Sequence, residues 1–147
     1  MTEEISDFIK SQRVSVFAIE MSDGSSHVST VHFAHTENPL LFIFETDRSY
    51  RKSEPLLQKE TSRASLVIGW EEGSNSKTFQ LDGDARVLKD DEQHLIEAYL
   101  AKFPEKTEKA SDPENLFFVF VPTWWRFTDW SRPEGKMIIT SHGKVTT

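Results

Sequence analysis

The residues best suited to bind a charged ligand are clustered between positions 46 and 52. This segment holds three cations and three hydroxyl groups, from Thr46, Arg48, Ser49, Tyr50, Arg51 and Lys52. Residues 40–44 before it are all apolar, as in a strand covered on both faces, and a short helix is expected to follow, up to about residue 60. Cations and hydroxyls beside the free N–H groups of a helix start suit a phosphate. On local chemistry alone, an ordinary surface loop is the competing interpretation.

Three histidines, His27, His32 and His35, invite a metal-site interpretation. In one regular strand, His27 and His35 would share a face while His32 faced the other way, so the three could not converge on one ion. No carboxylate stands at ligand spacing beside them, and the chain has no cysteine. The sequence therefore predicts no metal site. No nucleophile elbow or Ser-His-Asp order is present either, so no catalytic residue is assigned.

Two other groups have simpler interpretations. Asp82 and Asp84 share one face of an alternating segment and are expected to be solvated. Trp124, Trp125 and Trp130 have the side chains to stack on a planar ring, but such a cluster is more often core or dimer interface.

Length and charge indicate one soluble domain spanning residues 1–147. A chain of 147 residues buries about two-thirds of its unfolded surface. With 17 basic and 24 acidic residues the net charge is −7, and no dense basic stretch offers a surface to nucleic acid. No apolar run reaches half a membrane span, and the acidic first residues are unlike a signal peptide. We therefore expect a cytoplasmic protein with neither nucleic-acid nor membrane partners.

The elements that position these residues are mostly short strands. Strands are predicted at residues 13–21, 27–35, 40–44, 63–70, 77–88, 116–121 continuing extended to 130, and 136–140. One helix is predicted at residues 3–11, and another runs from its N-cap Asp90 to residue 103. Residues 71–76 are predicted to form a loop, residues 105–114 to be irregular, and the C-terminal tail to be frayed. The strand at 27–35 is polar enough to edge a sheet or line a cavity, and Gly83 indicates a bulge. Hairpins without βαβ alternation favour an antiparallel sheet that closes into a barrel.

A family resemblance emerges at the central stretch. Phe44-Glu-Thr-Asp-Arg-Ser-Tyr-Arg-Lys52, a short helix, and Thr61-Ser-Arg-Ala-Ser-Leu-Val-Ile-Gly-Trp70 resemble the FMN-binding split barrels of the pyridoxamine 5′-phosphate oxidase type. Leu81-Asp-Gly-Asp-Ala85 is similar to a later strand of that family, and the resemblance covers roughly residues 9–90 in order. It implies a mainly β, antiparallel split barrel with short flanking helices, and FMN bound at a homodimer interface by a flavin-dependent oxidoreductase of unknown substrate.

The resemblance also implies a set of cofactor-binding residues. Arg51 and Lys52 match the pair that holds the FMN phosphate, and the strand end before them lies near the ribityl chain. Residues 27–31 match the strand along the isoalloxazine ring, and Thr78 matches a residue offered by the second subunit. The full set is His27, Val28, Ser29, Thr30, Val31, Glu45, Thr46, Ser49, Arg51, Lys52 and Thr78.

The chain also differs from the family oxidase at informative positions. The oxidase carries cations where His27 and His32 stand and a serine where Tyr50 stands, and its C-terminal substrate-phosphate motifs are absent here. Turnover of pyridoxine or pyridoxamine phosphate is therefore not expected. The alternative to a flavoenzyme is a non-enzymatic split-barrel protein that binds haem, another ligand, or no cofactor.

Overall fold

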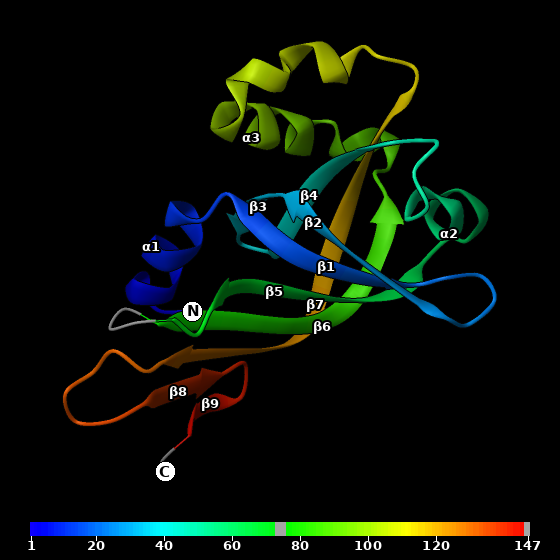
Figure 1. Cartoon of the computed structure of the whole chain (residues 1–147). Coiled ribbons are helices and arrows are strands. Elements are labelled where there is room, and N and C mark those ends of the chain that lie inside the picture. The colour runs from blue at the N-terminus through cyan, green and yellow to red at the C-terminus, as the bar shows by residue number, and fades with distance from the viewer. Residues whose placement is uncertain (73–75, 146–147) are drawn as a thin grey trace.

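The computed structural model describes residues 1–72 and 76–145, which form a nine-stranded antiparallel sheet with short helices around it (Figure 1). The helices are α1 (Glu3–Ser11), α2 (Ser53–Gln58) and α3 (His94–Lys102), with 3-10 segments η2 (Asp90–Glu92) and η3 (Pro104–Ala110). The strands are β1 (Val14–Glu20), β2 (Ser26–His32), β3 (Ala34–Glu37), β4 (Leu40–Asp47), β5 (Ser62–Trp70), β6 (Lys77–Val87), β7 (Asn115–Asp129), β8 (Met137–Thr140) and β9 (Gly143–Val145). The predicted loop at 71–76 falls in part on residues 73–75, which lie outside the described residues.

The order of the strands explains why the sheet curls. Its main path runs β2-β1-β5-β6-β7-β4-β3, so β2 and β3 lie at opposite ends although only Phe33 separates them in the chain. That connection brings the two ends together, as a split barrel requires. The prediction of one strand over 27–35 was wrong in this respect. The chain changes its partner from β1 to β4 at Phe33, which is fully buried.

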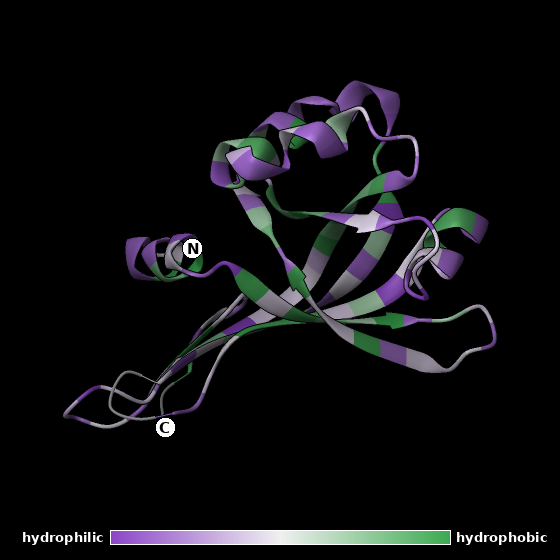
Figure 2. Cartoon of the chain, turned by 45° about the horizontal axis from the view of Figure 1, so that its top comes forward, coloured by the Kyte–Doolittle hydropathy of each residue, from purple (hydrophilic) through white to green (hydrophobic). Residues whose placement is uncertain are grey.

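Two core layers cover both faces of the neighbouring strands β4 and β7, as the apolar runs predicted. Phe42 and Phe44 of β4 point into the barrel, whereas Ile43 points to the other side. That second side, which we call the outer core, lies beneath α3 and consists of Ala34, Ile43, Leu95, Tyr99, Phe103, Phe117 and Val119. Figure 2 shows that α3 and the segment after it are largely hydrophilic on the side away from the sheet. The apolar side of the helix therefore packs against the sheet, and its polar side faces away from it.

Gly83 forms the bulge that the sequence predicted. The pairing of β6 with β7 shifts register between Asp82 and Gly83. A Cβ atom at Gly83 would lie 2.2 Å from the carbonyl oxygen of Val121, so this close approach of two strands requires glycine.

Several local predictions were wrong at element ends. Asp90 begins a 3-10 turn rather than capping α3. Residues 104–110, in the stretch predicted to be irregular, form 3-10 turns, and the tail predicted to be frayed pairs with β8 as β9. Pro55 is the third residue of α2, where a missing N–H breaks no helical hydrogen bond.

The ion pair of Arg86 with Glu92 should make stability depend on pH. Its two side chains are largely buried, with bonds of 2.6 and 2.9 Å that lower the pKa of Glu92 to about 2 from an ordinary 4.5. Because the folded pKa is depressed, the stabilisation is present above pH 4.5 and is lost as the pH falls towards 2. We expect Glu92→Gln to cost about 1–3 kcal/mol at pH 7. Urea titrations should show this difference from wild type shrinking below pH 4.5. Glu97→Gln, at an exposed glutamate of α3, is the control, and a difference independent of pH would contradict this role for the pair.

Candidate functional site

A polar pocket of about 230 Å³ lies where β2, the end of β4, the segment before α2 and η3 come together. Its lining is rich in cations and hydroxyl groups, and consists of Thr30, Val31, His32, Glu45, Thr46, Asp47, Tyr50, Lys52, Lys106 and Lys109. The two ends of the curled sheet and the α3–η3 segment therefore build one site.

One wall of this pocket holds two polar residues with little exposed surface, Lys52 and Thr46. Lys52 is only 8% exposed, and its ammonium group forms no hydrogen bond or ion pair with any described residue; it lies 5.0 Å from the centre of the Tyr50 ring. Burial lowers the pKa of Lys52, against the opposing effect of Glu45. Thr46 is 3% exposed, and its buried hydroxyl also has no partner among the described residues. Because such groups normally find partners, this wall fits an anionic ligand.

The start of α2 is arranged differently from the sequence prediction. The N–H groups of Ser53 and Glu54 donate to the carbonyl oxygens of Tyr50 and Arg51, at 2.9 and 3.2 Å. The Ser53 hydroxyl donates to the carbonyl oxygen of Asp47 at 2.7 Å. The expectation of free N–H groups at this helix start was therefore wrong. The tight turn before the helix uses these donors, and the side chains of Lys52 and Thr46 remain as the available groups.

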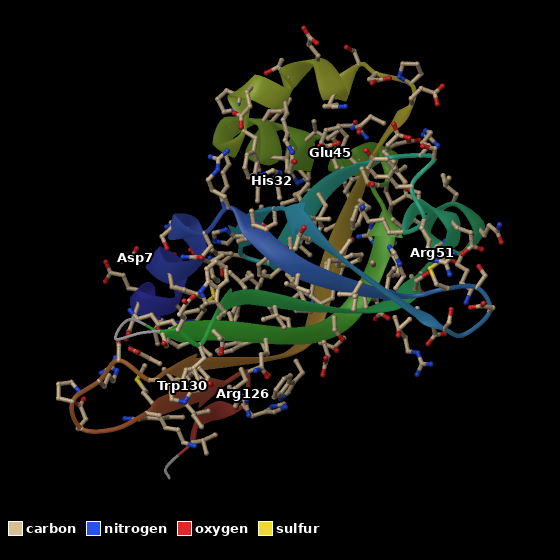
Figure 3. All side chains as sticks on the ribbon, in the orientation of Figure 1. Asp7, His32, Glu45, Arg51, Arg126 and Trp130 are labelled. Atoms are coloured by element: carbon tan, nitrogen blue, oxygen red, sulfur yellow. The ribbon has the colours of Figure 1, made fainter. Side chains whose placement is uncertain are left out.

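The opposite wall is built around Lys106 of η3. Its Nζ donates to Glu45 Oε1, the Tyr99 hydroxyl and His32 Nδ1, each at 3.1 Å. When the Asn115 amide is oriented with its nitrogen towards Glu45, it donates to Glu45 Oε2 at 2.6 Å. Figure 3 shows His32 and Glu45 together beneath α3, and Arg51 well to one side near α2. The Glu45 carboxylate is thus held between two elements that are far apart in the sequence.

The structure brings part of the predicted residue set together. Those that line the pocket are Thr30, Val31, Glu45, Thr46 and Lys52. Those that do not are His27, Val28 and Ser29, further along β2, and Ser49, Arg51 and Thr78. The N–H and hydroxyl of Ser49 donate to the Asp47 carboxylate, and Arg51 is exposed. Thr78 is buried on β6 opposite Thr128 of β7, and its hydroxyl has no partner among the described residues.

Five of the lining residues were not in the predicted cofactor-binding set: His32, Asp47, Tyr50, Lys106 and Lys109. Asp47 and Tyr50 lie inside the cationic stretch, so their proximity was a usable signal. Lys106 stands in a charged, irregular stretch 61 residues after Glu45, and nothing local connects the two.

Three larger hollows lie elsewhere, and one of them, of about 520 Å³ beside α1, is lined by Glu4 and Lys77, whose charged groups lie 3.9 Å apart. One of about 480 Å³, around Gly83, contains the ion pair of Arg63 with Glu20. One of about 630 Å³ lies beside α1 and α3, where Lys102 donates to the carbonyl oxygen of Gln12 and His35 contacts Glu37. In the part of the chain that the structure describes, none of these three hollows is lined by a buried polar side-chain atom that lacks a partner. The smaller pocket is therefore the better candidate.

Within residues 1–72 and 76–145, no group of three or more His, Asp or Glu side chains is placed to hold a metal ion. No helix in the same ranges is long and apolar enough to cross a bilayer.

The family described as "Pyridoxamine 5′-phosphate oxidase" matches residues 1–129. The chain therefore belongs to the pyridoxamine 5′-phosphate oxidase-like split-barrel family, and the fold class expected from the sequence is confirmed. No curated protein matches it.

Solved structures with the same fold come from several bacteria. A heme binding protein from Mycobacterium smegmatis has a TM-score of 0.73 at 16% identity, over 95% of this chain and 57% of that one. Campylobacter jejuni ChuZ has a TM-score of 0.74 at 8% identity, over 99% of this chain and 61% of that one. A pyridoxamine 5′-phosphate oxidase-related, FMN binding protein from Nostoc punctiforme has a TM-score of 0.65 at 15% identity, over 92% of this chain and 87% of that one. The chain spans less than two-thirds of the first two proteins, and these identities show the fold alone.

Proposed function

We propose that this protein binds FMN, with the phosphate against Lys52 and the Thr46 hydroxyl. The observation that carries the proposal is the buried Thr46 hydroxyl, which has no partner among the described residues, in the same pocket as Lys52, whose ammonium forms no hydrogen bond or ion pair with them. A lysine ammonium donates up to three hydrogen bonds and a threonine hydroxyl one, so the pair suits phosphate oxygens. The family and its FMN-binding structural relative support this choice of ligand.

The size of the pocket supports a site shared between two copies of the chain. At about 230 Å³ it is smaller than the roughly 300 Å³ or more that pockets for whole cofactors usually offer. Exposed valines Val14 and Val16 of β1 and Val28 of β2 share one sheet face with Thr30 and His32, two lining residues. We propose that a second copy packs on this face and completes the site for the flavin ring, making the protein a homodimer.

The proposed activity is flavin-dependent oxidation or reduction of an unassigned substrate. Bound FMN would supply hydride or electron transfer, while the protein binds, orients and excludes water from the cofactor. In this chain, Lys52 and Thr46 would hold the phosphate, and the β2 residues Thr30 and Val31 would form the wall beside the rest of the cofactor.

Parallel titrations test the choice of ligand. Protein freed of any cofactor is titrated with FMN, riboflavin and haem, followed by flavin fluorescence and by the haem absorption band. We expect saturable FMN binding at least about tenfold tighter than riboflavin binding, because riboflavin lacks the phosphate. Saturable haem binding together with no preference for FMN would overturn the proposal in favour of a haem protein of this fold.

The dimer makes a separate prediction. Light scattering should give about twice the chain mass, and Val16→Glu should reduce it to one chain mass, because a dimer axis would bring like charges together in an apolar interface. Val145→Glu is the matched control: both valines are 43% exposed, but Val145 lies on β9, away from the pocket. A wild-type monomer at micromolar concentration would contradict the shared site.

A further inference from the structure

The Lys106 network determines which ring nitrogen of His32 carries a proton. A lysine ammonium only donates hydrogen bonds, so each of its three partners must accept. Nζ of Lys106 lies 3.1 Å from His32 Nδ1, and Nδ1 must therefore be unprotonated. In a neutral imidazole the proton is then on Nε2.

The position of His32 leaves that N–H available. His32 is the last residue of β2 and lines the pocket beside Thr30 and Val31. Its Nε2 has no hydrogen-bond partner within the described residues, and its ring lies 5.3 Å from that of Phe103, which limits the positions the imidazole can take. The two other acceptors of Lys106, Glu45 and Tyr99, fix the ammonium from β4 and α3.

We propose that Lys106 is a positioning residue that holds His32 as a neutral imidazole with its proton on Nε2, and that this N–H is a hydrogen-bond donor that the end of β2 offers to the ligand. The proposal rests on the proposed function only for the identity of that ligand. It gives the second wall of the pocket a role that phosphate binding at Lys52 does not explain.

The surrounding charges favour the neutral imidazole. Burial lowers the pKa of His32, and the cations Lys106 of η3 and Arg13, before β1, lower it further, whereas Glu105 and Glu45 act in the opposite direction. A protonated His32 would carry a proton on Nδ1, which cannot accept from Lys106. Protonation at low pH should therefore break this hydrogen bond.

Nitrogen NMR of the histidine rings in the ligand-free protein tests the proposal. At about pH 7.5, above the ordinary histidine pKa, we expect His32 to show an unprotonated Nδ1 and a protonated Nε2. In Lys106→Met the ring should shift towards a mixture of tautomers, and its titration midpoint should move up because a nearby cation is gone. Lys109→Met removes a lysine of the same pocket that does not contact His32, and should leave the tautomer unchanged. His35, which is paired with Glu37, serves as an internal reference.

A protonated Nδ1 in the wild type, or an identical tautomer in Lys106→Met, would overturn the proposal. The wild-type spectrum decides the tautomer by itself, even where Lys106→Met fails to fold. Lys106→Arg, which still only donates, should preserve the Nε2–H form.

Addition of FMN tests the donor role. FMN should shift the Nε2–H signal of His32. The His32→Ala variant should bind FMN about threefold to tenfold more weakly than wild type. The His32→Gln variant, whose amide supplies an N–H, should keep most of the wild-type affinity. Equal affinity in His32→Ala would remove the donor role. A wild type that binds no FMN would refute the proposed function, while the tautomer would still decide the role of Lys106.

Discussion

Replacing Lys52 by methionine is expected to weaken FMN binding by about tenfold to a hundredfold, because hydrogen bonds to charged groups contribute roughly 1.5–3 kcal/mol. Riboflavin affinity should hardly change, since the lost contact is to the phosphate. The cofactor-free protein should be at least as stable as wild type, because burial disfavours the Lys52 cation, which forms no hydrogen bond or ion pair with the described residues. Fluorescence titration with both flavins and urea unfolding of the free protein measure these three effects.

Weaker FMN binding without a loss of stability in Lys52→Met would indicate a binding role, whereas a structural role would lower the stability of the cofactor-free protein. Lys59→Met, at the exposed C-terminal end of α2, is the matched control and should change neither flavin affinity nor stability. Arg51→Met should weaken FMN binding less than Lys52→Met does, because an exposed cation is screened by water and salt. Equal FMN affinity in Lys52→Met and wild type would place the phosphate elsewhere.

The largest loss of stability is expected for Phe118→Ala, at about 3–5 kcal/mol. Phe118 is fully buried, and its ring centre lies 4.9 Å from that of Phe44, nearly parallel, and 5.3 Å from that of Phe17. Removing the ring leaves a cavity where β1, β4 and β7 meet in the barrel. Thermal and urea unfolding measure the loss, on samples that retain a folded spectrum at low temperature.

Phe118→Leu is the graded control, because it keeps most of the apolar volume and should cost clearly less than Phe118→Ala. A cost below about 1 kcal/mol for Phe118→Ala would mean that the neighbouring rings collapse into the space, and would contradict a tightly packed barrel interior.

The sequence indicated most of the fold because local pattern and tertiary packing agree there. Residues 40–44 and 116–121 are apolar throughout and are covered on both faces, and Gly83 forms the bulge that its place in an alternating strand indicated. The break between β2 and β3 at Phe33 was not predicted, because an inward-facing phenylalanine fits the alternation of one continuous strand. Only the change of partner from β1 to β4, a tertiary event, interrupts it.

The candidate site was predictable on one wall and not on the other. Lys52 and Thr46 belong to a short segment whose composition already indicated anion binding. The use of the Ser53 and Glu54 N–H groups within the turn depends on turn geometry that composition does not fix. The second wall depends on where α3 and η3 pack, and this brings Lys106 to His32 across 74 residues of sequence.

The distance in sequence between the two walls has a consequence for how the protein is made. On the ribosome, β4 is synthesised long before Lys106 and before β7, which pairs with β4 along the register of Phe44 with Phe118. Pairings between such distant segments form slowly, since closing the long intervening loop costs entropy before any contact is gained. A growing chain therefore has no completed pocket until most of its residues have been translated. A ligand of this pocket would act late, and it would stabilise the finished fold by mass action rather than guide its assembly.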